Sequence, residues 1–150
     1  ARGARLPVTA LLLGLVLLAW PFGSPAQAPA PAGGRLTAHV LDLYSGTPAG
    51  GLRIDLLAVD GDKTQVLKSV ITNADGRPPD GPLLVPDSIK AGRYQAVVYL
   101  SDYYKRIGAR LPSGFHNRLI LEFDILDNQR PHHLPFQITP WTQSASVLPG

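Results

Sequence analysis

Hydrophobic and polar residues alternate with a period of two along most of the chain after residue 35. Leu52, Ile54 and Leu56 alternate with Arg53 and Asp55, which gives one buried and one solvent-facing side, as in a half-buried β-strand. Further runs of this kind predict strands at Leu36–Asp42, Gln65–Thr72, Arg93–Leu100, Leu119–Ile125 and His133–Thr139. Glycine, aspartate and asparagine turns separate them. Short strands at this spacing predict an all-β fold, an antiparallel sandwich.

One segment, Asp102–Gly108, breaks the alternation. Ser101 or Asp102 is suited to cap the start of a helix, and Gly108 is suited to the position just beyond its end. We therefore expect one short helix after the strand at Arg93–Leu100. The prolines between Pro78 and Pro86 predict a rigid loop outside the strand ladders, because proline has no N–H to donate.

The first 26 residues are typical of a secretory signal peptide. Arg2 and Arg5 precede an apolar run, Val8–Trp20, and small residues follow as far as Ala26. The run is shorter than the roughly 20 residues that span a bilayer. Cleavage after Ala26 is therefore favoured over an uncleaved membrane anchor, which stays the alternative. We expect an exported protein, periplasmic or secreted, with no stable membrane anchor.

Residues 27–34 read QAPAPAGG, a composition that predicts a flexible linker. Residues 35–150 then form the single domain that a chain of 150 residues suggests. The net charge of +3 falls to +1 when the two arginines of the signal peptide are removed. This charge is too small for a nucleic-acid partner. The absence of cysteine rules out disulfides and zinc sites built on thiolates.

Two imidazoles and one guanidinium are the candidate catalytic groups. His39 lies in the first predicted strand, on the same side as Thr37 and opposite to Ala38. Taken alone, it also fits a half-exposed strand histidine with no function. Arg77 follows the turn-forming pair Asp75-Gly76, where an arginine is usually solvated. Its functional interpretation is a planar fork that holds an anionic substrate.

His132 and His133 are adjacent on a predicted strand, so they face opposite sides of the sheet. At most one of them lines a given pocket, which disfavours a metal site built from the pair. His116 lies in a loop and fits a surface histidine. The chain has no G-x-S-x-G motif of a serine hydrolase.

Four motifs together resemble those of 5-hydroxyisourate hydrolase, the enzyme branch of the transthyretin family. They read A-H-V-L-D followed by G-T-P-A, T-N-A-D-G-R, D-Y-Y, and H-L-P-F-Q-I-T-P-W, and their order and spacing fit along Leu36–Trp141, most of the mature chain. The resemblance implies a transthyretin-like sandwich of two four-stranded sheets with one short helix. It also implies a homotetramer with active sites in a channel between subunits.

The resemblance assigns the catalytic residues His39, Arg77 and His133, with His39 and Arg77 also binding the substrate. His133 is matched rather than His132 because it immediately precedes a small apolar residue and proline. The implied reaction is hydrolysis of 5-hydroxyisourate, a purine-derived small molecule of uric acid degradation, without a cofactor or metal. The two histidines would position and deprotonate a water molecule, and Arg77 would hold the anionic substrate. Which histidine is the base is left open.

The last residues depart from the pattern that the resemblance implies. The enzymes are expected to end in Tyr-Arg-Gly-Ser, a tail that helps to form the active site, whereas ungapped continuation gives Ser146-Val147-Leu148-Pro149 here. Two alternatives to an active hydrolase therefore stay open. One is a catalytically inactive, exported transthyretin-like protein that binds a small molecule. The other is a structural β-sandwich in which the three side chains are incidental.

Overall fold

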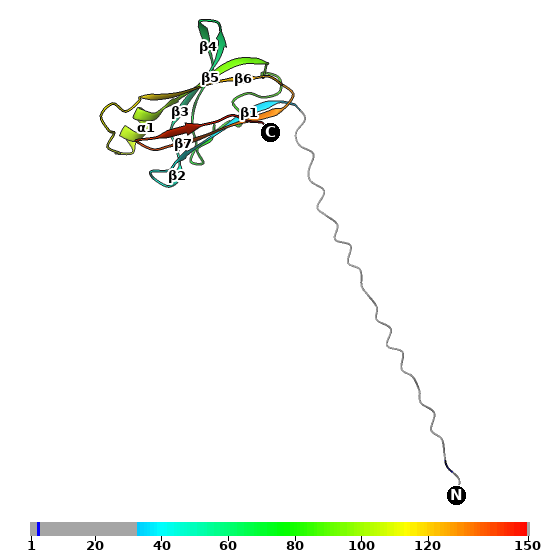
Figure 1. The fold of residues 1–150 in the computed structure, drawn as a ribbon, viewed down its shortest axis with the longest axis horizontal. Helices are drawn as coiled ribbons and strands as arrows, with labels where there is room; N and C mark the ends of the chain where they lie inside the picture. The colour runs from blue at the N-terminus through cyan, green and yellow to red at the C-terminus, as the bar shows by residue number, and fades with distance from the viewer. Residues whose placement is uncertain (1–2, 4–32, 150) are drawn as a thin grey trace. The chain divides into compact units, whose positions relative to one another are not determined.

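The computed structural model describes Gly3 and residues 33–149, and residues 35–149 contain two β-sheets and one short helix (Figure 1). The predicted signal peptide, apart from Gly3, and residues 27–32 of the predicted linker lie outside the described residues. Gly34, the last linker residue, is buried, because its backbone lies against the carbonyl of Asn128. Within the described part of the chain, no helix has the length and apolar character needed to cross a membrane.

The two sheets contain the strands that the alternation predicts. Sheet 1 has the order β2-β1-β7-β8, with β9 also paired to β7, and sheet 2 has the order β4-β3-β5-β6. The strands of sheet 1 are β1 (Arg35–Asp42), β2 (Thr47–Pro48), β7 (Pro131–Ile138), β8 (Gln143–Ala145) and β9 (Leu148–Pro149). Those of sheet 2 are β3 (Arg53–Asp60), β4 (Lys63–Ile71), β5 (Gly92–Tyr99) and β6 (Arg118–Ile125).

The predicted sandwich is confirmed, with two differences in sheet 1. First, β1 and β7 run parallel, whereas the other strand pairs are antiparallel. Second, the sheet has five strands rather than four. The short strands β8 and β9 share the edge beside β7, and both follow one register, with Phe136 opposite Ala145 and His133 opposite Leu148.

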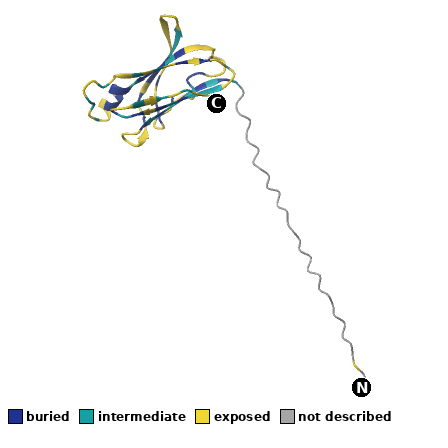
Figure 2. Ribbon diagram, in the orientation of Figure 1, coloured by how far each residue is buried: buried dark blue, intermediate teal, exposed yellow. Residues whose placement is uncertain are grey.

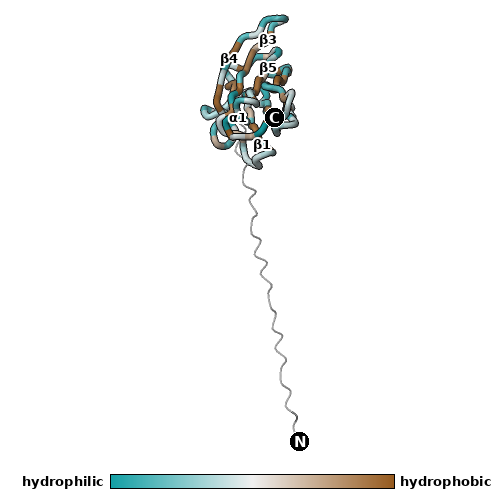
Figure 3. The backbone as a smooth tube through the Cα atoms, turned by 90° about the vertical axis from the view of Figure 1, so that its left-hand side faces the viewer, coloured by the Kyte–Doolittle hydropathy of each residue, from teal (hydrophilic) through white to brown (hydrophobic). Residues whose placement is uncertain are grey.

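The core lies between the sheets (Figure 2). Alternate residues of β1 and β7 are buried in it, whereas the short strands β2 and β9 are exposed. In β1, Leu36, Ala38 and Val40 are buried, whereas Thr37 and His39 on the other side are half-buried. The apolar stretches of β3, β4 and β5 lie side by side in Figure 3. Because the buried residues of β1 face this core, the outer side of sheet 1 carries polar side chains such as Thr37 and His39.

The helix α1 (Leu100–Arg106) begins earlier than predicted. Its N-cap residue is Tyr99, with no side-chain capping bond, so both predicted caps, Ser101 and Asp102, are wrong. Leu100 is fully buried, and this apolar anchor fixes the start of the helix in place of a capping hydroxyl. The predicted helix end is confirmed, because Gly108 follows the C-cap residue with a φ of 76°.

A buried carboxylate joins the helix to β1. Asp42 is 1% exposed and accepts hydrogen bonds from the hydroxyls of Tyr103 (3.0 Å) and Tyr104 (2.9 Å). It also accepts one from the backbone N–H of Tyr44, at 3.0 Å. Burial, followed by the bond to Asp42, raises the pKa of Tyr103 to about 12 and also raises the pKa of Tyr104. Both phenols are therefore neutral donors at neutral pH.

Candidate active site

The outer side of sheet 1 brings both predicted catalytic histidines together. Thr37 and His39 point outward from β1, opposite to its buried residues. The parallel register places Thr37 beside His133 and His39 beside Pro135 on β7. Directly paired residues in a sheet have side chains on the same face. His39 and His133 therefore lie on the same outer face, on the adjacent strands β1 and β7.

Arg77 reaches this face through a loop that docks on β1. The side chain of Asn73 accepts hydrogen bonds from the N–H groups of Asp75 (3.0 Å) and Arg77 (3.1 Å), which closes the loop. The carbonyl of Gly76 accepts a bond of 2.9 Å from the N–H of Val40, the neighbour of His39. Gly76 has a φ of 70°, and a Cβ there would collide with the carbonyl of Val40. Glycine thus allows the close approach that places Arg77 beside the strand.

The three side chains are electrostatically coupled. Burial is the main cause that lowers the pKa of His133 below its usual 6.5, and the charges of Arg77 and His39 lower it further. His133 is therefore neutral at pH 7 and has a ring nitrogen lone pair available to accept a proton. A small cavity of about 140 Å³ is bounded by Arg77 and by Thr37, the residue paired with His133, together with Ala38, Pro78, Gly81 and Pro82.

His132 faces away from this group. It points to the other side of β7 and lines a separate cavity with Asp124 and Val147. Its Nδ1 atom is buried and has no hydrogen-bond partner among the described residues. The expectation that only one of the two adjacent histidines faces a given site agrees with this geometry. Their catalytic roles stay predictions.

The C-terminal strand β9 lies beside His133. Leu148 pairs with His133 and Pro149 with His132, so the side chain of Leu148 lies on the same outer face as His133. Ser146 donates its N–H to the carbonyl of Pro135 at 3.3 Å, which holds the segment between β8 and β9 in place. The divergent tail therefore still borders the site, with an apolar side chain beside the imidazole.

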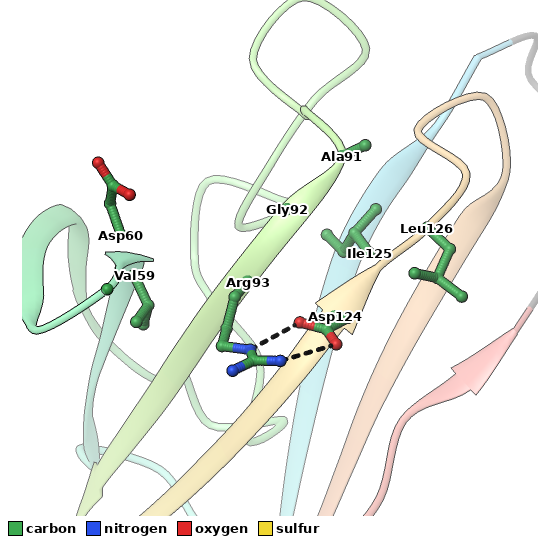
Figure 4. Close-up of a pocket in the computed structure, with 9 residues that line it drawn as sticks. Val59, Asp60, Ala91, Gly92, Arg93, Asp124, Ile125 and Leu126 are labelled. Carbon is green, nitrogen blue, oxygen red and sulfur yellow. Dashed lines mark hydrogen bonds and ion pairs between the residues drawn. The ribbon is translucent and has the colours of Figure 1, made fainter.

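A cavity of about 440 Å³ lies on sheet 2 and contains none of the three predicted residues. Figure 4 shows that Arg93 and Asp124 meet at this cavity, with the guanidinium Nε 2.9 Å from the carboxylate Oδ1. Asp60 is the other charged residue of its lining, and no histidine lines it. Among the residues that the structure describes, no three His, Asp or Glu side chains gather closely enough to hold a metal ion.

Comparison with known proteins identifies the family. The model of the HIUase/Transthyretin family matches residues 36–145, which include the sandwich and all three candidate residues. The chain belongs to this family. Among its curated relatives, 5-hydroxyisourate hydrolase 2 of Rhizobium meliloti (strain 1021) is 40% identical over 112 residues, which are 74% of this chain and 92% of the relative.

Solved structures support the membership of the HIUase/Transthyretin family. A 5-hydroxyisourate hydrolase from Klebsiella pneumoniae superposes with a TM-score of 0.62 at 31% identity, covering 76% of this chain and 98% of that one. An (S)-allantoin synthase superposes with a TM-score of 0.70 at 30% identity, covering 79% of this chain. This chain spans only 44% of the length of the synthase, so that match concerns one part of a larger protein.

Sequence reasoning did not single out two residues that border the histidines. Thr37 was placed only on the same side as His39, yet its hydroxyl lies 2.7 Å from Nδ1 of His133. Leu148 was treated only as part of a departure from the expected tail, yet it pairs with His133. The contact between Thr37 and His133 arises from the parallel register of β1 and β7, which the alternation of residues does not encode.

Proposed function

We propose that this protein hydrolyses 5-hydroxyisourate in purine degradation. The observation that carries the proposal is the gathering of His39, Arg77 and His133 around one outer face of sheet 1, in a chain of the HIUase/Transthyretin family. The name of the R. meliloti relative, which this chain covers almost fully, gives the substrate.

The side chains suit the opening of a cyclic amide by water. In this reaction, water adds to a ring carbonyl carbon, the carbon–nitrogen bond breaks, and a proton moves from the water to the leaving nitrogen. The exposed guanidinium of Arg77 holds the anionic substrate and stabilises the negative charge that develops on the attacked oxygen. His39 and His133 supply the proton transfers, which typically accelerate such reactions by about 10²–10⁴-fold.

The direct test follows the ultraviolet absorbance of freshly made 5-hydroxyisourate, which decays as the ring opens. We expect the purified protein to accelerate the decay, and His39→Ala and His133→Ala to lose most of the acceleration. His116 provides the control. His116→Ala removes an exposed imidazole from the loop between α1 and β6, outside sheet 1. A wild-type protein no faster than buffer would refute the proposed hydrolysis.

We also propose that the protein is a homotetramer in which a neighbouring subunit covers the outer face of sheet 1. The support is the open nature of this face, where Thr37, His39 and His133 are only half-buried and Leu148, the apolar neighbour of His133, is 48% exposed. A second subunit would bury these side chains and exclude water from the reaction. Sedimentation equilibrium at several concentrations tests this, and a monomer at all of them would contradict it.

Export is the third part of the proposal, and it rests on the amino-terminal sequence. The two arginines, the apolar run and the small residues before Gln27 form the pattern of a cleaved signal peptide. Expression of the full chain followed by cell fractionation and mass spectrometry tests this. We expect a periplasmic or secreted product that begins at Gln27, and a full-length product in the cytoplasm would refute it.

A further inference from the structure

The hydroxyl of Thr37 is the polar neighbour of His133 within the sheet. Its Oγ1 atom lies 2.7 Å from Nδ1 of His133, and both residues are half-buried. On the other side of His133 stands Leu148, whose side chain has no polar atom. The imidazole therefore lies between a hydrogen-bonding neighbour and an apolar one, and among the described residues Thr37 is its hydrogen-bond partner.

The hydroxyl hydrogen of Thr37 already has an acceptor. Its Oγ1 atom also lies 3.3 Å from the backbone carbonyl of His132, and a carbonyl can only accept. A hydroxyl has one hydrogen, so when it donates to the carbonyl it must accept in its other contact. Nδ1 of His133 then carries the ring proton and donates it to Thr37, which leaves Nε2 with a free lone pair.

We propose that Thr37 is a positioning residue that holds His133 in the Nδ1–H tautomer and so makes Nε2 the general base. This inference rests on the proposed hydrolysis and decides which histidine deprotonates the water. Nε2 takes a proton as the water oxygen bonds to the ring carbonyl carbon. The carbon–nitrogen bond then breaks, and the imidazolium returns the proton from Nε2 to the leaving nitrogen, so the enzyme regains its starting form.

The surroundings of His133 support this assignment in two further ways. Its pKa is lowered mainly by burial and further by Arg77 and His39, so the ring is neutral and able to accept a proton at pH 7. A neutral imidazole has two tautomers, and only one of them presents a lone pair at Nε2. Without a hydrogen-bond acceptor at Nδ1, some of the protein molecules would carry the ring proton of His133 on Nε2, which could then not accept a proton from water.

The experiment reads the tautomer and the kinetics in the same set of variants. The protein is labelled with ¹⁵N-histidine, and its four histidines are assigned by single substitution. Ring nitrogen shifts at pH 7.5 then report which nitrogen of His133 is protonated. Thr37→Val keeps a β-branched side chain without the hydroxyl, and Thr37→Ser keeps the hydroxyl. Thr64→Val, which makes the same substitution at an exposed position of β4 in sheet 2, is the control.

We expect the Nδ1–H tautomer in wild type, Thr37→Ser and Thr64→Val, and a loss of it in Thr37→Val. The kcat of Thr37→Val should fall by about 10- to 100-fold with KM changed less than about twofold, because the substrate anchor Arg77 is untouched. An Nε2–H ring in an active wild type, or full kcat in Thr37→Val, would overturn the inference alone. An Nδ1–H ring in an inactive wild type would instead reject the proposed hydrolysis and with it the base role of Nε2.

Discussion

The buried carboxylate of Asp42 allows a prediction that separates hydrogen bonding from burial. Tyr103 and Tyr104 are neighbours in α1, and each donates its hydroxyl to one carboxylate oxygen of Asp42. Tyr104 is the more deeply buried of the two. An argument from burial alone would therefore rank Tyr104→Phe as the more destabilising change. The hydrogen bonds predict the opposite order.

The two oxygens of Asp42 differ in how many donors they have. Oδ1 accepts from Tyr104 and also from the N–H of Tyr44, whereas Oδ2 accepts from Tyr103 as its sole donor among the described residues. A hydrogen bond to a charged group contributes about 1.5–3 kcal/mol. We expect Tyr103→Phe to lower the free energy of unfolding by about 2–3 kcal/mol, since it leaves a buried oxygen without a donor. Tyr104→Phe should cost about 1–1.5 kcal/mol.

Urea unfolding at pH 7, followed by circular dichroism at one fixed protein concentration, measures both changes. The fixed concentration matters because subunit association adds to the apparent stability. Tyr94→Phe is the matched control, since Tyr94 is also buried but donates to a neutral acceptor, the carbonyl of Lys90, at 2.7 Å. Its cost should be about 1 kcal/mol. Equal losses for Tyr103→Phe and Tyr104→Phe, or a larger loss for Tyr104→Phe, would refute the reasoning.

Three further predictions concern pH and the loop that carries Arg77. In the folded protein the pKa of Tyr103 is raised from 10.0 to about 12. The stability that its neutral hydroxyl contributes is therefore complete below pH 10 and is lost as the pH rises towards 12. Phenolate absorbance and alkaline unfolding measure this loss. The acid limb of kcat/KM, which reports the free enzyme, should lie below pH 6.5 and move upward in Arg77→Gln, because that arginine lowers the pKa of His133; a limb that stays in place would contradict the coupling. Gly76→Ala should lower the free energy of unfolding by about 1–3 kcal/mol and raise KM. The control is Gly46→Ala, which has a similar φ of 73° but open space around its Cβ and should lower the free energy of urea unfolding by less.

The sequence predicts the longer strands well because strands such as β1 and β7 keep one face in the core. The short strands β2, β8 and β9, which have no buried residue, were not predicted. The alternation of Leu36, Ala38 and Val40 with Thr37 and His39 correctly indicates which side of β1 is buried. Alternation is the same for parallel and antiparallel neighbours, however, so it could not reveal that β1 and β7 run parallel. The start of α1 was misplaced for a related reason. A capping residue is a local signal, whereas the burial of Leu100 depends on the whole sandwich.

The faces that the candidate residues occupy were predictable, but their contacts were not. The strand alternation oriented His39 and showed that His132 and His133 face opposite sides, and the choice of His133 came from the family resemblance. The approach of Arg77 depends on a hydrogen bond between Gly76 and Val40, which are far apart in the chain. The hydroxyl of Thr37 meets His133 only through the register of β1 and β7. Such contacts are set by tertiary structure, and no local pattern encodes them.

The parallel pairing of β1 with β7 has a consequence for how the protein acquires its activity. Thr37 and His133 are separated by 96 positions in the chain, so their contact closes one of the largest loops in the domain. Contacts of long sequence separation carry the largest entropic cost of loop closure and slow the folding of β-proteins. A chain that is synthesised or exported only as far as β6 already has His39 and Arg77, but it lacks the imidazole that Thr37 orients. Catalysis therefore begins only once the two ends of the domain have met, which makes turnover a direct signal of complete folding.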